Sequence, residues 1–265
     1  MTDRHLPVSA SIITLNEEHN IPDCLRSVDF CSEMVVVDSN STDRTREIAR
    51  NMGARVYARP FEGHWQQKQW ALEQCNNPWV LCLDADERVT PELRDFLFTL
   101  DFRSSSADGF EVRRRHVFLG RVMAHSSLYP DYKLRLARRE KARWGGVNPH
   151  DTLLVSGRTQ KLPFDILHYA WQDCRHYLMT QIRYAHIMAH EKYRTGTRAG
   201  ISDLTLRPIY TFFYRFFIRA GILDGFPGLV VSAGGAAACF AKYAFLKELE
   251  RKEIHDKFSQ GSETG

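Results

Sequence analysis

The sequence is that of a medium-sized globular protein. Its 265 residues are 43% hydrophobic and 26% charged, which excludes an intrinsically disordered chain, a collagen and a pure coiled coil. The formal net charge of +4 is too small to indicate nucleic-acid binding, although it suits an anionic ligand or an anionic membrane surface. The six cysteines form no C-x-x-C pair and no long apolar stretch opens the chain, so we expect a protein of the reducing cytosol.

Strand and helix patterns alternate along the first hundred residues. Apolar runs predict strands at 8–15, 34–37, 54–58 and 79–83, and helices are expected at 20–28, 42–52, 65–75 and directly after Thr90. Strands separated by single helices indicate βαβ units and a parallel sheet. The rhythm changes near residues 104–106, after which antiparallel strands are expected at 109–119 and 133–137. The pattern therefore predicts an α/β fold.

The last third of the chain reads as helical from Trp171 onward, with a polar tail, 259–265, that we expect to be disordered. Ile209–Ile218 combines aromatic residues with neighbouring arginines, and 225–241 is apolar but rich in glycine and alanine and interrupted by Pro227. The uncharged run is shorter than the roughly 20 residues that a membrane-spanning helix needs. We therefore expect amphipathic helices lying on a membrane surface. The alternative is that these helices cap the domain or form a dimer interface.

The most specific motif is the segment WVLCLDADE at residues 79–87. It places Asp84, Asp86 and Glu87 directly after a buried strand, at the carboxyl end where parallel α/β sheets bind ligands. Three clustered carboxylates repel one another unless a cation is present, and their hard oxygen atoms suit Mg²⁺ or Mn²⁺ holding a diphosphate. A solvated acidic turn is the alternative, which the preceding apolar strand and the following capped helix make less favourable.

Two further strands end in polar residues. Asp38 follows the apolar run at 34–37, where a carboxylate can accept hydrogen bonds from the ribose or the base of a nucleotide. Asp43 is better explained as an acid in the first turn of a helix. Thr14 and Asn16 follow the first strand. We expect these strand ends and Asp84 to lie side by side in one crevice.

On these residues the chain resembles the glycosyltransferases of family 2, which have the GT-A fold. Within them it is most similar to bacterial lipopolysaccharide-core glucosyltransferases, which add a β-1,4-glucose to an inner-core heptose. The matching segments are SIITLNEE, VVVDSNSTDRT, QQKQWAL and LDADE, followed by RLARR, LPFDILHY, LDGFPGL and FAKYAFLKE. The resemblance implies a GT-A (Rossmann-like) domain with a mixed sheet at 1–170, divided into a nucleotide-sugar half at 1–105 and an acceptor half at 106–170. A membrane-associating helical extension at 171–258 would follow.

The resemblance also implies the reaction. It is an inverting, metal-dependent transfer of a hexose, with glucose as the first choice, from a UDP-sugar to an inner-core sugar of lipopolysaccharide or lipooligosaccharide. The cofactor would be Mg²⁺ or Mn²⁺, and the protein would sit on the cytoplasmic face of the inner membrane. Two alternatives remain open: a family 2 transferase acting on an exopolysaccharide lipid carrier or a peptide, and a non-catalytic module that binds nucleotide-sugars or anionic glycans. The acidic crevice argues against nucleic acid as a partner, and the sequence leaves the oligomeric state open.

The resemblance assigns the donor site residue by residue: Thr14, Asn16 and Asp38 to the uracil and ribose, Gln67 and Lys68 to the diphosphate, Asp84 to the ribose or sugar, and Asp86 to the metal. The sequence departs from the family pattern in two places. Asp38-Ser39 stands where many members carry two adjacent acids, so that one carboxylate is left to read the base. Gln69 stands where an asparagine is commoner.

The acceptor side is less well defined by the sequence. The motif WGGVNPHD offers Asp151 as the catalytic base, with an Asx-type turn residue as its alternative role. Asp131 is the second candidate and Glu87 the third. Arg135 is expected to contact the acceptor or a phosphate, whereas the other arginines near it are expected on the surface. His168 is expected in a packed core pair with Tyr169.

Overall fold

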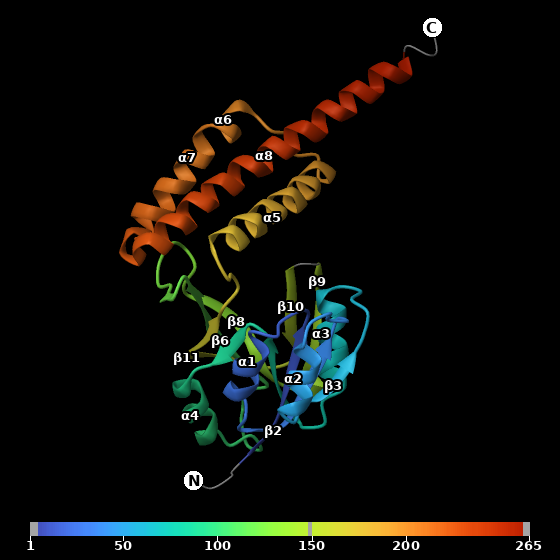
Figure 1. The fold of residues 1–265 in the computed structure, drawn as a ribbon, viewed down its shortest axis with the longest axis vertical. Coiled ribbons are helices and arrows are strands. Elements are labelled where there is room, and N and C mark those ends of the chain that lie inside the picture. Colours follow the sequence, from blue (N-terminus) through green and yellow to red (C-terminus); the bar gives the residue numbers. More distant parts are fainter. Residues whose placement is uncertain (1–4, 148–149, 262–265) are drawn as a thin grey trace. The chain divides into compact units, whose positions relative to one another are not determined.

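The computed structural model describes residues 5–147 and 150–261 and divides into two compact units (Figure 1). The sheet unit spans Met1–His116 and Pro130–Ala170, and the helical unit spans Val117–Tyr129 and Trp171–Gly265. Residues 117–129, which we expected in the acceptor half, therefore pack with the helices.

The first half of the sheet unit follows the predicted alternation. Its strands are β1 (Leu6–Thr14), β2 (Cys31–Asp38), β3 (Arg55–Ala58) and β4 (Trp79–Asp84), and its helices are α1 (Ile21–Ser27), α2 (Thr45–Asn51), α3 (His64–Glu73) and α4 (Pro91–Thr99). β1 pairs in parallel with both β2 and β4, and β2 pairs in parallel with β3. Thr90 begins α4 as predicted, since its side chain accepts a hydrogen bond from the amide of Leu93 at 3.3 Å.

The second half turns the sheet into a mixed one. It adds β5 (Glu87–Val89), β6 (Gly109–Phe118), β8 (Asp131–Arg138) and β11 (Thr159–His168), giving the order β3-β2-β1-β4-β8-β6-β11-β5, and β7 (Arg121–Val122) pairs with the end of β6. β8 is antiparallel to β4 and β6, whereas β11 is parallel to β6 and antiparallel to β5. The expected α/β fold with a mixed sheet is confirmed.

A separate hairpin was not expected from the sequence. After a short 3₁₀ turn, η1 (Arg139–Lys141), the strands β9 (Ala142–Val147) and β10 (His150–Val155) pair antiparallel. Glycine and proline have low strand propensity, so the sequence WGGVNPHD carries no strand signal. The hairpin matters for the site because β10 carries Asp151.

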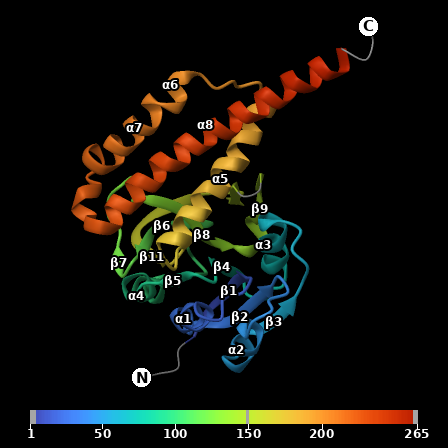
Figure 2. The same ribbon diagram turned by 45° about the horizontal axis from the view of Figure 1, so that its top comes forward.

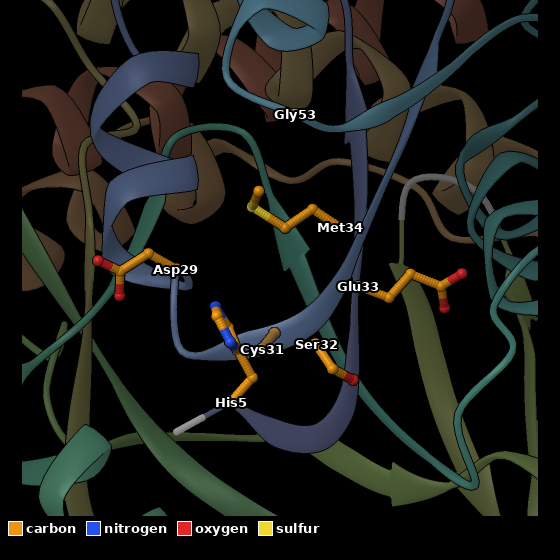
Figure 3. Close-up of a pocket in the computed structure, with 7 residues that line it drawn as sticks. All are labelled: His5, Asp29, Cys31, Ser32, Glu33, Met34 and Gly53. Carbon is orange, nitrogen blue, oxygen red and sulfur yellow. The ribbon is translucent and has the colours of Figure 1, made fainter. Parts of the chain in front are cut away.

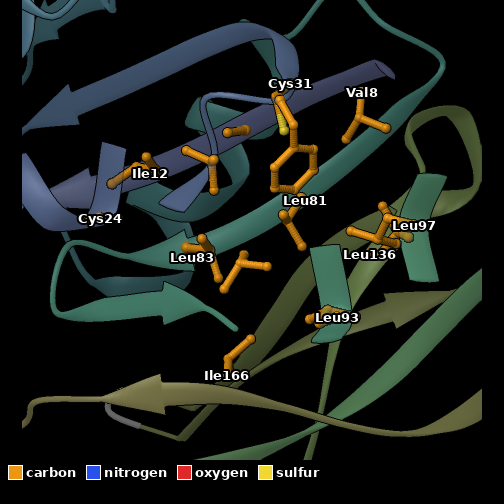
Figure 4. Packing of buried hydrophobic residues seen from close by; sticks show 14 of the residues in the cluster. Val8, Ile12, Cys24, Cys31, Leu81, Leu83, Leu93, Leu97, Leu136 and Ile166 are labelled. Carbon is orange, nitrogen blue, oxygen red and sulfur yellow. The ribbon is translucent and has the colours of Figure 1, made fainter. Parts of the chain in front are cut away.

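The main core lies against β1 and β4, the central strands of the parallel half. Figure 4 shows apolar side chains from these strands, among them Val8, Ile12 and Leu81, packed with Leu136 of β8. Trp79 is fully buried beside Phe110, with 5.8 Å between the ring centroids. This packing fixes the relative register of the strands whose ends form the site.

The helical unit consists of helices packed along one long helix. Its elements are α5 (Cys174–Arg194), α6 (Ile201–Leu204), α7 (Leu206–Phe213), a π-helical segment η2 (Tyr214–Ile218), a 3₁₀ turn η3 (Gly221–Asp224) and α8 (Gly225–Gly261). Both α5 and α7 run along α8 (Figure 2). Tyr177 of α5 is buried and donates a hydrogen bond to the carbonyl of Val231 on α8 at 3.0 Å.

α8 differs from the expectation at both ends. It passes through Pro227 without interruption, because proline in the first turn of a helix costs no hydrogen bond. It also includes residues 259–261, where we predicted a disordered tail, and 262–265 lie outside the described residues. Among the described residues, Gly221–Lys252 is the one helical segment long and apolar enough to cross a membrane, a criterion that the core helix of a water-soluble protein also meets.

Candidate active site

The carboxyl ends of three parallel strands form the floor of the site. In the sheet register, Thr14 at the end of β1 lies opposite Asp38 at the end of β2, and Ile13 lies opposite Asp84 at the end of β4. The expectation that these strand ends lie side by side is therefore confirmed.

The acidic motif forms a tight turn between β4 and β5. The amide of Asp84 donates to a carboxylate oxygen of Glu87 at 3.1 Å, and the other oxygen of Glu87 accepts a hydrogen bond from Arg135. Glu87 is fully buried. It cannot meet an acceptor, which removes it as a catalytic base and leaves it the role of holding the turn.

Asp84 lies between two buried cations. Lys68 Nζ is 2.9 Å from its Oδ1, and Arg135 Nη2 is 3.4 Å from its Oδ2. Burial raises the pKa of the Asp84 carboxyl, but the charges of Lys68 and Arg135 outweigh burial and hold the pKa well below its ordinary value. Asp84 is therefore ionised at neutral pH.

Arg135 differs from its expected role. We expected it to contact the acceptor, but it is 4% exposed and its guanidinium is engaged by Glu87 and Asp84. Burial lowers the pKa of Arg135, but the two carboxylates raise it by more, so the pKa lies above its ordinary value and the side chain keeps its charge. In this structure Arg135 is a buried counter-ion that supports the acidic turn from β8.

Lys68 connects the donor side to the hairpin. Its ammonium lies 2.9 Å from Oδ2 of Asp151 on β10, and 4.8 Å from the centre of the Trp144 ring on β9. Burial lowers the pKa of Lys68, but attraction to Asp84 and Asp151 reverses the shift, so the group is charged. The expected base, Asp151, is thus brought next to Asp84 by a shared lysine that we expected to line the diphosphate.

Asp86 meets a histidine from the end of β11. Its Oδ2 lies 3.2 Å from Nε2 of His168, and the amide of Tyr169 donates to the Asp86 carbonyl at 2.9 Å. Burial raises the pKa of Asp86, but the attraction and hydrogen bond of His168 lower it below its ordinary value overall. The expected packed pair with Tyr169 is not what the structure shows: His168 packs against His116, with 4.8 Å between the ring centroids and the two rings tilted, and its Nε2 faces the acidic motif.

The Asp86–His168 pair is compatible with a divalent cation. A carboxylate oxygen and an imidazole nitrogen are ordinary ligands of Mn²⁺, and Mg²⁺ binds through one or two protein groups plus water and substrate phosphates. Within the described part of the chain no three His, Cys, Asp or Glu side chains converge on one point. The remaining positions around a cation would therefore belong to solvent and to the donor diphosphate.

The loops after β1 and β2 are joined by hydrogen bonds. Asp38 is fully buried and accepts hydrogen bonds from the amide and the hydroxyl of Ser41, whose hydroxyl oxygen accepts from the amide of Asn16 at 2.8 Å. The Asn16 side chain accepts from the amide of Thr42 at 2.9 Å. Asp38 and Asn16, expected at the uracil and ribose, order the two loops in this structure.

Thr14 and Gln67, two further residues expected to contact the nucleotide-sugar donor, are buried. Thr14 is 4% exposed, and its hydroxyl has no hydrogen-bond partner among the described residues, which suits a polar ligand atom above the strand end. Gln67 is fully buried, donates to the Ser39 hydroxyl at 3.1 Å and accepts from Arg59 at 2.8 Å. Gln67 therefore links α3 to the loop after β2.

Asp131, the second candidate for the base, is paired with two cations. Its Oδ2 lies 2.8 Å from Arg114 on β6, and its Oδ1 lies 3.1 Å from Lys133.

Glu17, which the sequence did not single out by itself, lies near Asp86: burial together with repulsion from Asp86 and Asp43 raises the pKa of Glu17 to about 7. The motif SIITLNEE contains it, so the signal was present.

A hollow at the beginning of β2 lies outside this site. It has a volume of about 290 Å³ and is lined by residues around the beginning of β2, including Cys31, Glu33 and Met34 (Figure 3). These residues lie at the end of β2 opposite to Asp38. The chemistry-bearing side chains are gathered at the carboxyl ends of the strands instead.

Residues 9–153 match the model of glycosyl transferase family 2, and this match covers more than half of the chain. The chain belongs to glycosyltransferase family 2. The expected enzyme class, a nucleotide-sugar-dependent glycosyltransferase with the GT-A fold, is therefore confirmed. The matched segment contains the three strand ends, the acidic turn, Lys68 and Asp151.

Relatives over the whole length carry related names. This family 2 glycosyltransferase is 32% identical over 259 residues to the lipopolysaccharide core biosynthesis glycosyltransferase LpsC of Rhizobium meliloti (strain 1021), a match covering 94% of this chain and 93% of the relative. It is 30% identical over 258 residues to an uncharacterized glycosyltransferase of Rickettsia typhi, covering 92% and 88%. Among solved structures, S. aureus TarS 1–349 in complex with UDP-GlcNAc is 18% identical with a TM-score of 0.47, covering 94% of this chain and 92% of that one.

Proposed function

We propose that this family 2 glycosyltransferase transfers a hexose, with glucose as the first choice, from a UDP-sugar to an inner-core sugar of lipopolysaccharide. The reaction would take place at the cytoplasmic face of the inner membrane. The observation that carries the proposal is the cluster at the strand ends, in which Asp84, Lys68 and Asp151 are joined by ion pairs beside the Asp86–His168 pair. The full-length similarity to the lipopolysaccharide core biosynthesis relative supports the acceptor class.

The donor would be held by the strand-end residues together with a divalent cation. Asp86 and His168 are the side chains that would bind Mg²⁺ or Mn²⁺, and a bound cation would offset the charge of the departing diphosphate. Asp84, ionised and backed by Lys68 and Arg135, presents oxygen atoms that accept hydrogen bonds from ribose or sugar hydroxyls. Thr14 offers an unoccupied hydroxyl at the neighbouring strand end.

The base on the acceptor side would be Asp151. In an inverting transfer a carboxylate takes the proton of the attacking hydroxyl as the new glycosidic bond forms and the bond to the diphosphate breaks. Asp151 is 10% exposed at its side chain, and Lys68 fixes one of its oxygens, which leaves the other for the acceptor hydroxyl. In Asp131, by contrast, each of the two oxygens is engaged by a cation.

The base assignment is tested by two matched variants. Asp151→Asn is expected to lower kcat by about 10²- to 10⁴-fold, the usual contribution of a general base, whereas Asp131→Asn lowers it less than tenfold. Binding of the donor, measured by calorimetry with UDP, should remain in both variants. The opposite ranking of the two kcat values would transfer the role to Asp131.

The reaction itself is tested by UDP release from a panel of UDP-hexoses and GDP-mannose, with purified inner-core lipopolysaccharide as acceptor, with and without Mn²⁺. We expect turnover confined to UDP-sugars plus metal. Asp86→Asn is expected to reduce it by about 100-fold or more, and the exposed Asp95→Asn is the matched control. Turnover on a polyprenyl-phosphate or peptide acceptor, with none on the core, would replace the acceptor. Donor binding without turnover on any acceptor would indicate a binding module.

A further inference from the structure

The helical unit exposes a continuous run of apolar side chains between residues 206 and 229. Ten apolar residues in this run are each between 41% and 74% exposed. Monomeric soluble proteins rarely expose so many neighbouring apolar side chains, and such a patch marks an interaction site. The ten residues are Leu206, Ile209, Tyr210, Phe213, Phe217, Ile218, Ile222, Leu223, Phe226 and Leu229. We call this set the aromatic face.

The aromatic face follows helical geometry. Leu206, Tyr210, Phe213 and Phe217 are spaced by four, three and four residues, so they lie along one side of α7 and η2. Phe213 and Phe217 stack with 5.5 Å between ring centroids. η2 leads through η3 into α8, and η2 and η3 both contact α8. The exposed residues of these three elements therefore belong to one compact unit.

The charges of this segment are all positive on the outside. Between Asp203 and Glu248 the sequence contains a single acidic residue, Asp224. Asp224 is 1% exposed, and its carboxylate accepts hydrogen bonds from the amides of Ala124 and His125 and from the His125 ring, so its charge is withdrawn from the surface.

The arginines remain outside. Arg219 is exposed at the end of the α7–η2 segment; Arg207 at its beginning is also exposed but is paired with Asp203, and Arg215 lies half-buried against Gly235 of α8. An apolar, aromatic helix face with only cationic charges exposed beside it is complementary to the surface of an anionic lipid bilayer. A second copy of this chain would present the same cations and would not offer that complementarity.

We propose that the aromatic face is a membrane-docking surface, in which α7 and η2 lie in the headgroup region with their aromatic side chains inserted and with Arg219 at the lipid phosphates. The proposal deepens the proposed function, because a lipid-linked acceptor is reached at a membrane surface. It does not require that function, since the interaction involves only the helical unit.

The test measures binding of the full-length protein to vesicles by sedimentation. The wild-type protein is expected to bind phosphatidylglycerol vesicles and to bind phosphatidylcholine vesicles much less. The double variant Phe213→Gln/Phe217→Gln is expected to lose affinity on the order of tenfold or more, because two half-exposed aromatic rings no longer transfer into lipid. Arg219→Gln is expected to lose about fivefold, the effect of one cation near an anionic surface.

The matched control is Met179→Gln/Met188→Gln on α5, which removes two comparably exposed apolar side chains outside the aromatic face. Circular dichroism verifies that each variant is folded. Equal losses in the test and control variants, or no preference for anionic vesicles, would overturn the proposal. A dimer in sedimentation velocity that the Phe213/Phe217 variant abolishes, without vesicle binding, would assign the face to a second copy. Calorimetry with UDP on the same variants keeps this result separate from the donor site.

Discussion

Replacing Lys68 by methionine tests whether the ion-pair cluster is organised as the structure indicates. Lys68 is 8% exposed and lies 2.9 Å from a carboxylate oxygen of both Asp84 and Asp151. With about 4 Å between charge centres and an effective dielectric constant of about 20, each pair contributes about 4 kcal/mol of attraction, against a desolvation cost of several kcal/mol for the ammonium. Lys68→Met removes the cation that Asp84 and Asp151 share, which leaves Asp84 with Arg135 and takes the ion pair away from Asp151. We therefore expect the free energy of unfolding at pH 7 to fall by about 3–5 kcal/mol.

The pH dependence follows from the pKa of Asp84. In the wild-type protein this pKa lies well below its ordinary value of 3.8, so the stabilisation is fully present above pH 3.8 and is lost only as the pH falls through the lower, folded-state pKa. Without Lys68 the pKa of Asp84 rises, because Arg135 alone compensates its charge, and protonation relieves the remaining strain at higher pH. The difference between variant and wild type is therefore expected to shrink between pH 7 and about pH 4.

The assay is urea unfolding followed by tryptophan fluorescence at several pH values. Lys161→Met removes an exposed lysine of the same unit and is the matched control, with an expected change of about 0.5 kcal/mol or less. Asp151→Asn combined with Lys68→Met should recover part of the loss, because one unpaired carboxylate is removed. A loss of less than about 1 kcal/mol, or one that does not diminish at lower pH, would refute the ion-pair reasoning.

Three further predictions address other parts of the molecule. Glu87→Gln, which removes the fully buried one of the two carboxylates paired with Arg135, is expected to lower the free energy of unfolding by about 3 kcal/mol, and a loss below about 0.5 kcal/mol in urea titrations would contradict its role in the turn. His168→Gln is expected to weaken Mn²⁺ binding in the presence of UDP by at least about tenfold in electron paramagnetic resonance titrations, whereas His190→Gln on α5 leaves it unchanged. Gly228→Ala would place a Cβ 1.9 Å from the Gly221 carbonyl oxygen, so we expect a loss of about 1–3 kcal/mol by thermal unfolding. Equal melting temperatures for Gly228→Ala and for Gly200→Ala, whose Cβ would make only ordinary contacts at 3.6 Å or more, would be inconsistent with this packing.

Much of the nucleotide-sugar half could be predicted from local pattern. Apolar runs of strand length, separated by helices with recognisable starts such as Thr90, determine a parallel βαβ arrangement, because each element must bury its apolar face against the next. In such an arrangement the carboxyl ends of the strands share one edge, which is why the sequence alone places Thr14, Asp38 and Asp84 together.

The tertiary structure alone decided how the charged groups pair. Nothing local in the sequence indicates that Lys68 joins Asp84 to Asp151, or that Arg135 is buried rather than facing an acceptor. These contacts depend on the register of antiparallel strands and on a hairpin whose glycines resemble a loop. His168 reaches Asp86 for the same reason, since β11 ends beside the acidic turn. Periodicity records which face of an element is buried, whereas the partner of a buried charge is set by contacts between elements distant in the chain.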